Sequence, residues 1–177
     1  MRKLLFLAFL LAVPTLGQAQ STDLRAAAGC GPDKTQFSVK ADSNQHAVKQ
    51  PEPGQALVYV IVQGKPEGGE VKVTTRVGLD GNWMGANHGA SYLSFSVAPG
   101  EHHVCADWQS SLKSRQKLSG AADLTAEAGK TYYFRTEVVL SQATESHDER
   151  LSLKPVDTSE GLLLISKSAE SSSTIKK

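Results

Sequence analysis

The chain has 177 residues, a length typical of one domain with short extensions. Its hydrophobic fraction of 40% and charged fraction of 21% exclude collagen-like, coiled-coil and wholly disordered proteins. Its 19 Lys and Arg residues nearly balance 18 Asp and Glu residues, for a formal charge of +1, so it lacks the basic excess of nucleic-acid-binding domains. We therefore expect one folded domain that does not bind nucleic acid.

An apolar run near the N-terminus predicts export. Two basic residues precede ten apolar ones at residues 4–13, and Gly17 and Ala19 then place small residues where a signal peptidase reads them. Ten helical residues cover only about half of a ~30 Å hydrocarbon core. Residues 1–19 are thus predicted to be a signal peptide cleaved after Ala19. The mature protein is expected in the periplasm or secreted, with no membrane-spanning segment.

Residues 27–30 could instead form a lipoprotein sorting signal. Small residues directly before Cys30 resemble a bacterial lipoprotein box, whose cysteine becomes the lipidated N-terminus. Such a box adjoins the apolar part of its signal, whereas here the polar residues 18–25 intervene. Cleavage after Ala19 is favoured, and a lipid-anchored subunit of an envelope complex is the alternative.

The chain has two cysteines, Cys30 and Cys105. Export would place them where disulfides form and persist. A bridge between them would lower the conformational entropy of the unfolded chain and so stabilise the fold by about 4 kcal/mol. If Val104 and Ala106 face the core, then Cys105 faces the other way. The bridge would then staple an N-terminal arm across the outer surface or edge of a sheet. Two separate thiols are the alternative.

The first half of the chain reads as an arm followed by strands. Residues 20–55 are rich in turn formers and predict an arm and linker, with a short strand at 37–39. Ala56–Val62 is apolar throughout, as in a strand buried on both faces. Residues 70–79 alternate, with charged residues such as Arg76 on the face opposite Val77, so that face is expected to contact water.

Turn residues then predict three hairpins. The first turns at Asp80-Gly81, which suits a two-residue hairpin turn. The second joins Ser91–Val97 to residues 102–108 through the Pro-Gly turn at 98–101. The third joins residues 118–126 to Thr131–Leu140 through the turn at 128–130.

The C-terminal part predicts a strand, a helix and a tail. Residues 151–156 read as the last strand, and 157–160 resemble a helix capping box ahead of the apolar residues 162–165, for which another strand is the alternative. Residues 166–177 have little to bury and predict a disordered tail. The fold class is all-β: an antiparallel β-sandwich over residues 56–165, immunoglobulin- or prealbumin-like, ending in a short helix.

Several of these segments together resemble a bacterial family of exported small β domains of unknown function. They are ALVYV at 56–60, LDG at 79–81 with Gly85, YLSFSVAPGEHHV at 92–104 and AEAGKTYY at 126–133. The third segment alone is also similar to PEGA-type surface β domains. The resemblance implies an all-β envelope or secreted protein, and it carries over no catalytic residue, ligand or cofactor.

The sequence contains no catalytic signature. It lacks the Gly-x-Ser-x-Gly elbow of serine hydrolases and a phosphate-binding glycine loop that opens a helix. His103 and Asp107, on one strand face, are the candidate metal ligands and would need a distant His to complete a site; the spacing of the histidines is not a ligand code. We therefore expect no cofactor.

The sequence supports a binding surface better than a catalytic site. Tyr92 and Tyr133, with Arg135, are predicted to point outward, where aromatic side chains recognise sugars or proteins. The sequence thus predicts an exported, non-catalytic domain with a binding or structural role, whose partner is an unknown envelope protein or glycan. A metal-dependent or hydrolytic enzyme on the same scaffold is the alternative.

Overall fold

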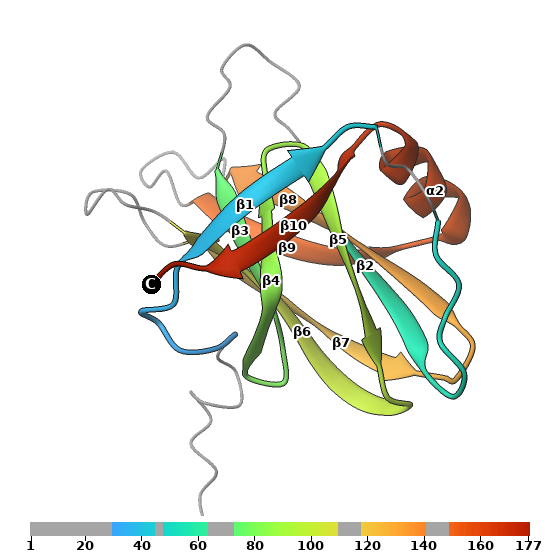
Figure 1. Cartoon of the computed structure of the whole chain (residues 1–177). Coiled ribbons are helices and arrows are strands. Elements are labelled where there is room, and N and C mark those ends of the chain that lie inside the picture. Colours follow the sequence, from blue (N-terminus) through green and yellow to red (C-terminus); the bar gives the residue numbers. More distant parts are fainter. Residues whose placement is uncertain (1–29, 45–47, 64–72, 110–117, 141–148) are drawn as a thin grey trace, which may run out of the picture.

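The computed structural model describes residues 30–44, 48–63, 73–109, 118–140 and 149–177. In these residues, two β-sheets face each other, and one helix, α2 (Thr158–Ser166), lies on the larger sheet (Figure 1). Sheet A has the strand order β1 (Phe37–Asp42), β10 (Ala169–Ile175), β5 (Ser91–Val97), β2 (Ala56–Val62), β8 (Thr131–Leu140), β9 (Glu149–Val156). Sheet B has the order β4 (Asn82–His88), β3 (Thr74–Leu79), β6 (Gly100–Gln109), β7 (Ser119–Ala126). The predicted all-β sandwich is confirmed.

Most neighbouring strands are antiparallel, but sheet A is mixed. Strand β2 runs parallel to β8, and β10 runs parallel to β5 over a short stretch. Asp80 and Gly81, with φ of 49° and 77°, form a two-residue turn between paired residues Leu79 and Asn82. The hairpin predicted at this turn is therefore confirmed.

Strand β2 separates two apolar clusters. Val58 and Val60 face the core between the sheets, where they pack with residues of sheet B such as Val77 and Val104. The alternate residues of β2 lie on the opposite face of sheet A, in a second cluster that includes Ile165 of α2. The prediction that β2 is covered on both faces is confirmed, and α2 provides the second cover.

Helix α2 begins where the capping signal predicts. The Asp157 carboxylate accepts a hydrogen bond from the backbone N–H of Glu160 at 2.8 Å, which satisfies one of the free N–H groups of the first turn. The helix is thus favoured over the alternative of another strand. It contacts sheet A through Gly161, because a Cβ atom there would overlap the ring of Tyr133.

Replacing Gly161 by alanine is expected to destabilise the protein, although alanine normally stabilises a helix interior by about 1 kcal/mol relative to glycine. The added methyl would lie 2.5 Å from Cδ1 of Tyr133, and overpacking of this kind costs about 1 to 3 kcal/mol. Thermal unfolding of Gly161→Ala should show a lower Tm. The control is Ser159→Ala, at an exposed position of the same helix; a Tm that rises in Gly161→Ala would contradict this packing.

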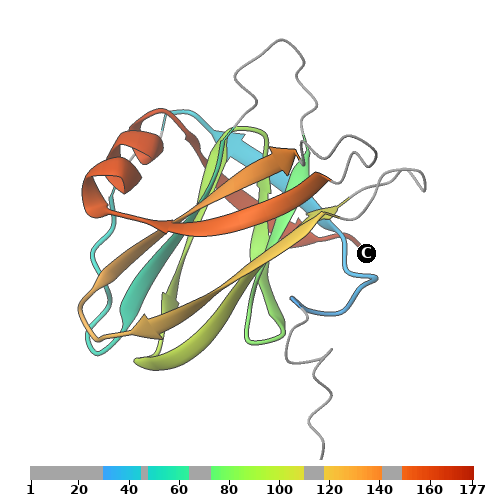
Figure 2. The same ribbon diagram turned by 180° about the vertical axis from the view of Figure 1, so that it is seen from behind.

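The second and third predicted hairpins are both wrong. Strand β5 pairs with β2 and β10 in sheet A, whereas β6 pairs with β3 and β7 in sheet B. Strand β7 pairs with β6 in sheet B, whereas β8 pairs with β2 and β9 in sheet A. The turn before β8, in which the N–H of Lys130 donates to the carbonyl of Glu127, carries the chain from one sheet to the other (Figure 2). A tight turn between two strands does not reveal whether they pair or separate, so the sequence could not distinguish these outcomes.

The predicted disordered tail is also wrong, because it contains strand β10. Residues 170–175 of this strand pair with β1, which places β1 of the predicted arm inside the domain. Serines take the place of apolar residues here: Ser171 donates to the hydroxyl of Ser91 at 2.8 Å, and the hydroxyl of Ser173 accepts from the N–H of Ala86 at 3.0 Å. A small polar strand whose groups are satisfied by neighbours does not need apolar burial.

Some sequence predictions lie wholly or partly outside the described residues. They are the signal peptide at residues 1–19, the arm and linker at 20–55, the lipoprotein box at 27–30 and the beginning of the strand predicted at 70–79. Within the described ranges, no helix is long and apolar enough to cross a membrane.

Candidate functional site

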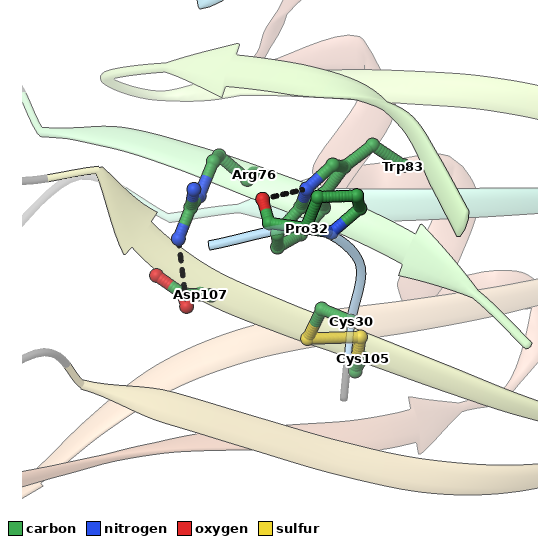
Figure 3. The surroundings of a disulfide bond; sticks show 6 residues. All are labelled: Cys30, Pro32, Arg76, Trp83, Cys105 and Asp107. Carbon is green, nitrogen blue, oxygen red and sulfur yellow. Dashed lines mark hydrogen bonds and ion pairs between the residues drawn. A yellow bond between two sulfur atoms is a disulfide. The ribbon is translucent and has the colours of Figure 1, made fainter. Parts of the chain in front are cut away.

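The two cysteines form a disulfide on the outer face of sheet B. Cys30 and Cys105 are joined with a Cα–Cα distance of 5.5 Å across a sequence separation of 75 residues. The arm passes so close to β3 that a Cβ atom at Gly78 would overlap the carbonyl of Cys30. The predicted staple is confirmed, and it holds the arm against the sheet (Figure 3).

Arg76 lies under this arm, although the sequence predicts that its face contacts water. The side chain is only 3% exposed. Its guanidinium lies 2.9 Å from the Asp107 carboxylate, donates to the carbonyls of Asp33 and Thr35 at 3.1 and 2.7 Å, and sits 4.3 Å from the ring centre of Trp83. Alternation along one strand cannot show that a distant segment covers it, which explains the wrong prediction.

We call residues 30–35 together with Arg76, Trp83 and Asp107 the arm clasp. The Trp83 indole N–H donates to the carbonyl of Pro32 at 3.0 Å, so both the cation and the ring beneath it bind arm backbone. A guanidinium held by a carboxylate, two carbonyls and an aromatic face is fixed in place. The arm clasp is therefore a structural feature that supports the disulfide.

The predicted binding face at Tyr92 and Tyr133 is not exposed. Both residues lie on the outer face of sheet A, as strand parity predicts, but α2 covers them, so they are 0% and 6% exposed. Tyr59 lies between them, with ring-centre distances of 5.8 and 5.4 Å. Burial raises the pKa of Tyr92 to about 12. Arg135 donates to Glu160 of α2 at 2.6 Å, so these residues anchor the helix.

His103 and Asp107 are not brought together. They are four residues apart on an extended strand, a separation of about 13 Å. His103 Nδ1 lies 3.2 Å from the Asp123 carboxylate, and Asp107 is the ion-pair partner of Arg76. Over the described ranges, no group of three or more His, Cys, Asp and Glu side chains could hold a metal ion.

His102 forms a contact that sequence reasoning missed. Its Nδ1 lies 2.7 Å from the Asp80 carboxylate and its Nε2 lies 2.8 Å from the carbonyl of Ala98. The other Asp80 oxygen accepts the backbone N–H of His103 at 2.8 Å. Because both ring nitrogens face acceptors, only the protonated imidazolium donates both hydrogen bonds. His102 thus joins the turn after β3 to the turn after β5.

The pKa values of this pair shift in opposite directions. Burial lowers the pKa of His102, but its hydrogen bonds to Asp80 and Ala98 outweigh burial and raise it overall. Burial raises the pKa of Asp80, but hydrogen bonds from His102 and His103 outweigh burial and lower it overall. Both shifts favour the charged pair over its neutral form.

The stabilisation by this pair is expected to depend on pH. Because the pKa of His102 is raised in the folded protein, His102 stabilises the fold fully below its pKa in the unfolded chain, about 6.5. This stabilisation is lost as the pH rises through the pKa of the folded state. Because the pKa of Asp80 is lowered in the folded protein, Asp80 stabilises the fold fully above its pKa in the unfolded chain, about 3.9. This stabilisation is lost as the pH falls through the pKa of the folded state. Wild type should therefore exceed His102→Gln in Tm most between about pH 4 and 6.5.

A matched control for this pH profile is His88→Gln, because the His88 ring bonds to the Thr74 hydroxyl instead of a carboxylate. Its difference in Tm from wild type should not follow the His102→Gln profile. A difference between wild type and His102→Gln that is equal at pH 5.5 and at pH 8.5 would show that the imidazolium bonds do not form.

A surface pocket of about 340 Å³ lies where β7, β8, β9 and α2 meet. It exists because β7 and β8 leave their shared turn in different sheets (Figure 2), an arrangement that the sequence did not predict. Its lining residues are Asp123, Leu124, Thr125, Thr131, Tyr132, Tyr133, Phe134, Pro155, Val156, Asp157 and Thr158. We call it the β7–β9 pocket. It combines apolar groups, hydroxyls and two carboxylates, as small-molecule sites do.

No protein-family model, curated protein or solved structure matches this chain. The resemblance to exported β domains and to PEGA-type domains therefore stays a prediction. The geometry described above carries the functional argument.

Proposed function

We propose that this protein is an exported, non-catalytic β-sandwich domain that acts by binding, or as a structural component, in the bacterial envelope. The observation that carries the proposal is the Cys30–Cys105 disulfide. Disulfides of this structural kind persist in the periplasm and outside the cell, and are rare in a reducing cytosol. The predicted signal peptide at residues 1–19 fits the same compartment.

The contacts of the polar side chains favour binding or structure over catalysis. Arg76 is held in the arm clasp, Arg135 holds α2, and His102 joins two turns. Each of these groups therefore has a role in holding the fold together. The β7–β9 pocket, by contrast, contains side chains such as Thr125 and Thr158 that are exposed at the surface, where a ligand can reach them.

Fractionation of bacterial cells that produce the full chain tests the location. We expect the protein in the periplasm or the medium, beginning at Gln20. A Leu5→Arg/Leu10→Arg variant interrupts the apolar run and should stay in the cytoplasm at full length, because a signal peptide needs that run. The matched Leu5→Ile/Leu10→Ile variant keeps the run apolar and should be exported as wild type is.

Two results would contradict the proposal in different ways. A full-length wild-type chain in the cytoplasm would remove the export. A membrane fraction whose chain begins at lipidated Cys30 would establish the lipid-anchored alternative, and it would leave Cys105 without its disulfide partner.

A further inference from the structure

We propose that the β7–β9 pocket binds a small organic cation, an amine or quaternary ammonium ion with an apolar substituent. The inference deepens the binding role proposed above and rests on it. Three features of the pocket carry the assignment: the charge of its lining, the apolar and aromatic side chains among that lining, and its size.

The charge of the lining favours a cation. Asp123 and Asp157 line the pocket, and none of its lining residues, all of which the structure describes, is Lys or Arg. Asp157 uses Oδ1 to cap α2, and the Asp123 side chain, 91% exposed, lies near His103 through Oδ1. The field of the two carboxylates attracts a positive ligand and repels a phosphate or a carboxylate.

Lys154, a cation of β9 beside the pocket lining in sequence, does not neutralise this lining. Lys154 immediately precedes the lining residue Pro155, and alternation along β9 directs the two side chains to opposite faces. The Lys154 ammonium lies 3.3 Å from the Glu137 carboxylate, so its charge is already paired away from the two aspartates.

Several uncharged residues of the lining are apolar and firmly held. Leu124 and Phe134 are buried members of the core between the sheets, and Tyr132 packs against that core. The Tyr132 hydroxyl also accepts the backbone N–H of Glu127 at 3.0 Å, which fixes the ring beside the turn. The partly exposed ring of Tyr132 and the exposed Pro155 offer apolar surface to an alkyl substituent, and aromatic rings attract ammonium groups.

The size of the pocket limits its occupant. Its volume of about 340 Å³ is at the lower end of the range for small-molecule sites, about 300 to 1,000 Å³. It therefore suits a small metabolite. The hydroxyls of Thr125, Thr131 and Thr158 would also suit a neutral sugar, but a sugar would make no use of the two negative charges, so the cation is favoured.

Titration with choline, followed by calorimetry and by backbone amide chemical shifts, tests the assignment in the full mature chain. We expect choline to bind at least tenfold more tightly than dimethylbutanol, its uncharged isostere, and than glucose. The shifted amides should belong to the pocket lining. Putrescine, a diamine without methyl groups, distinguishes a general amine site from one that prefers a quaternary ammonium.

The Asp123→Asn/Asp157→Asn variant removes both charges and should weaken choline binding at least tenfold. Asparagine is as good an N-cap as aspartate, so α2 should keep its start, and an unchanged Tm verifies the fold. The matched control is Asp33→Asn, an exposed aspartate outside the pocket, which should leave choline binding unchanged.

Several results would overturn the proposal. They are equal binding of choline and dimethylbutanol, tighter binding of glucose, unchanged affinity in the folded double variant, and no binding of choline or putrescine at about 10 mM. Each of these would leave the proposed export and envelope role standing, because the fractionation experiment tests that role without any ligand.

Discussion

Replacing both cysteines by alanine should lower the free energy of unfolding by about 4 kcal/mol. The disulfide closes a loop of 75 residues, and the entropy that it removes from the unfolded chain is lost in Cys30→Ala/Cys105→Ala. The arm clasp alone must then hold the arm. Chemical denaturation of the variant and of wild type, with and without reductant, measures the difference.

Reductant supplies the control, because it should destabilise wild type to the level of the double variant and leave the variant itself unchanged. Lys34 is an exposed residue of the arm, so trypsin cleavage after it should become faster once the disulfide is gone. Equal stability of variant and wild type, with an unchanged rate of cleavage after Lys34, would show that the disulfide does not hold the arm.

Arg76→Met should destabilise the protein by about 3 kcal/mol. Methionine leaves the Asp107 carboxylate, whose side chain is only 14% exposed, without its cation. The carbonyls of Asp33 and Thr35 also lose their donor. Breaking a buried pair from one side is costly because the remaining charge is neither solvated nor paired. Urea denaturation measures the loss.

A second substitution separates the unpaired charge from the loss of shape. Arg76→Met/Asp107→Leu should recover much of the lost stability, because an apolar pair can replace a buried ion pair with little cost. Lys154→Met is the matched surface control: the Lys154 and Glu137 side chains are 53% and 44% exposed, so the substitution should cost less than about 1 kcal/mol. A loss in Arg76→Met no larger than this would contradict the clasp.

Local signals in the sequence predicted much of the fold. Apolar continuity identified β2 as a strand covered on both faces, and a capping aspartate located the start of α2. Asp80 and Gly81 predicted a two-residue hairpin turn because their backbone angles suit one. In each case the cause lies within a few residues of the structure that it specifies.

The errors share a physical cause, since each involves a segment far away in the chain. The burial of Arg76 depends on arm residues such as Asp33 and Thr35, which lie 43 and 41 positions earlier in the chain. Strand β10 is polar, and it forms because β1 and β5 offer it edges to pair with. Alternation and composition describe one segment at a time, so they cannot report such contacts.

The candidate site was less predictable than the fold. Strand parity placed Tyr92 and Tyr133 on the correct face but could not show that α2 covers that face. The β7–β9 pocket exists only because β7 and β8 belong to different sheets, which a turn signal does not disclose. The carboxylates of Asp123 and Asp157, 34 residues apart, become neighbours of one cavity through that topology.

The intact mass of the protein isolated from its native host, before and after reduction and with its N-terminus sequenced, tests the central claim most directly. The account predicts a chain that begins at Gln20, gains two hydrogens on reduction, and yields one cross-linked peptide pair containing Cys30 and Cys105. An unprocessed chain with two free thiols, or a chain that begins at lipidated Cys30, would contradict it.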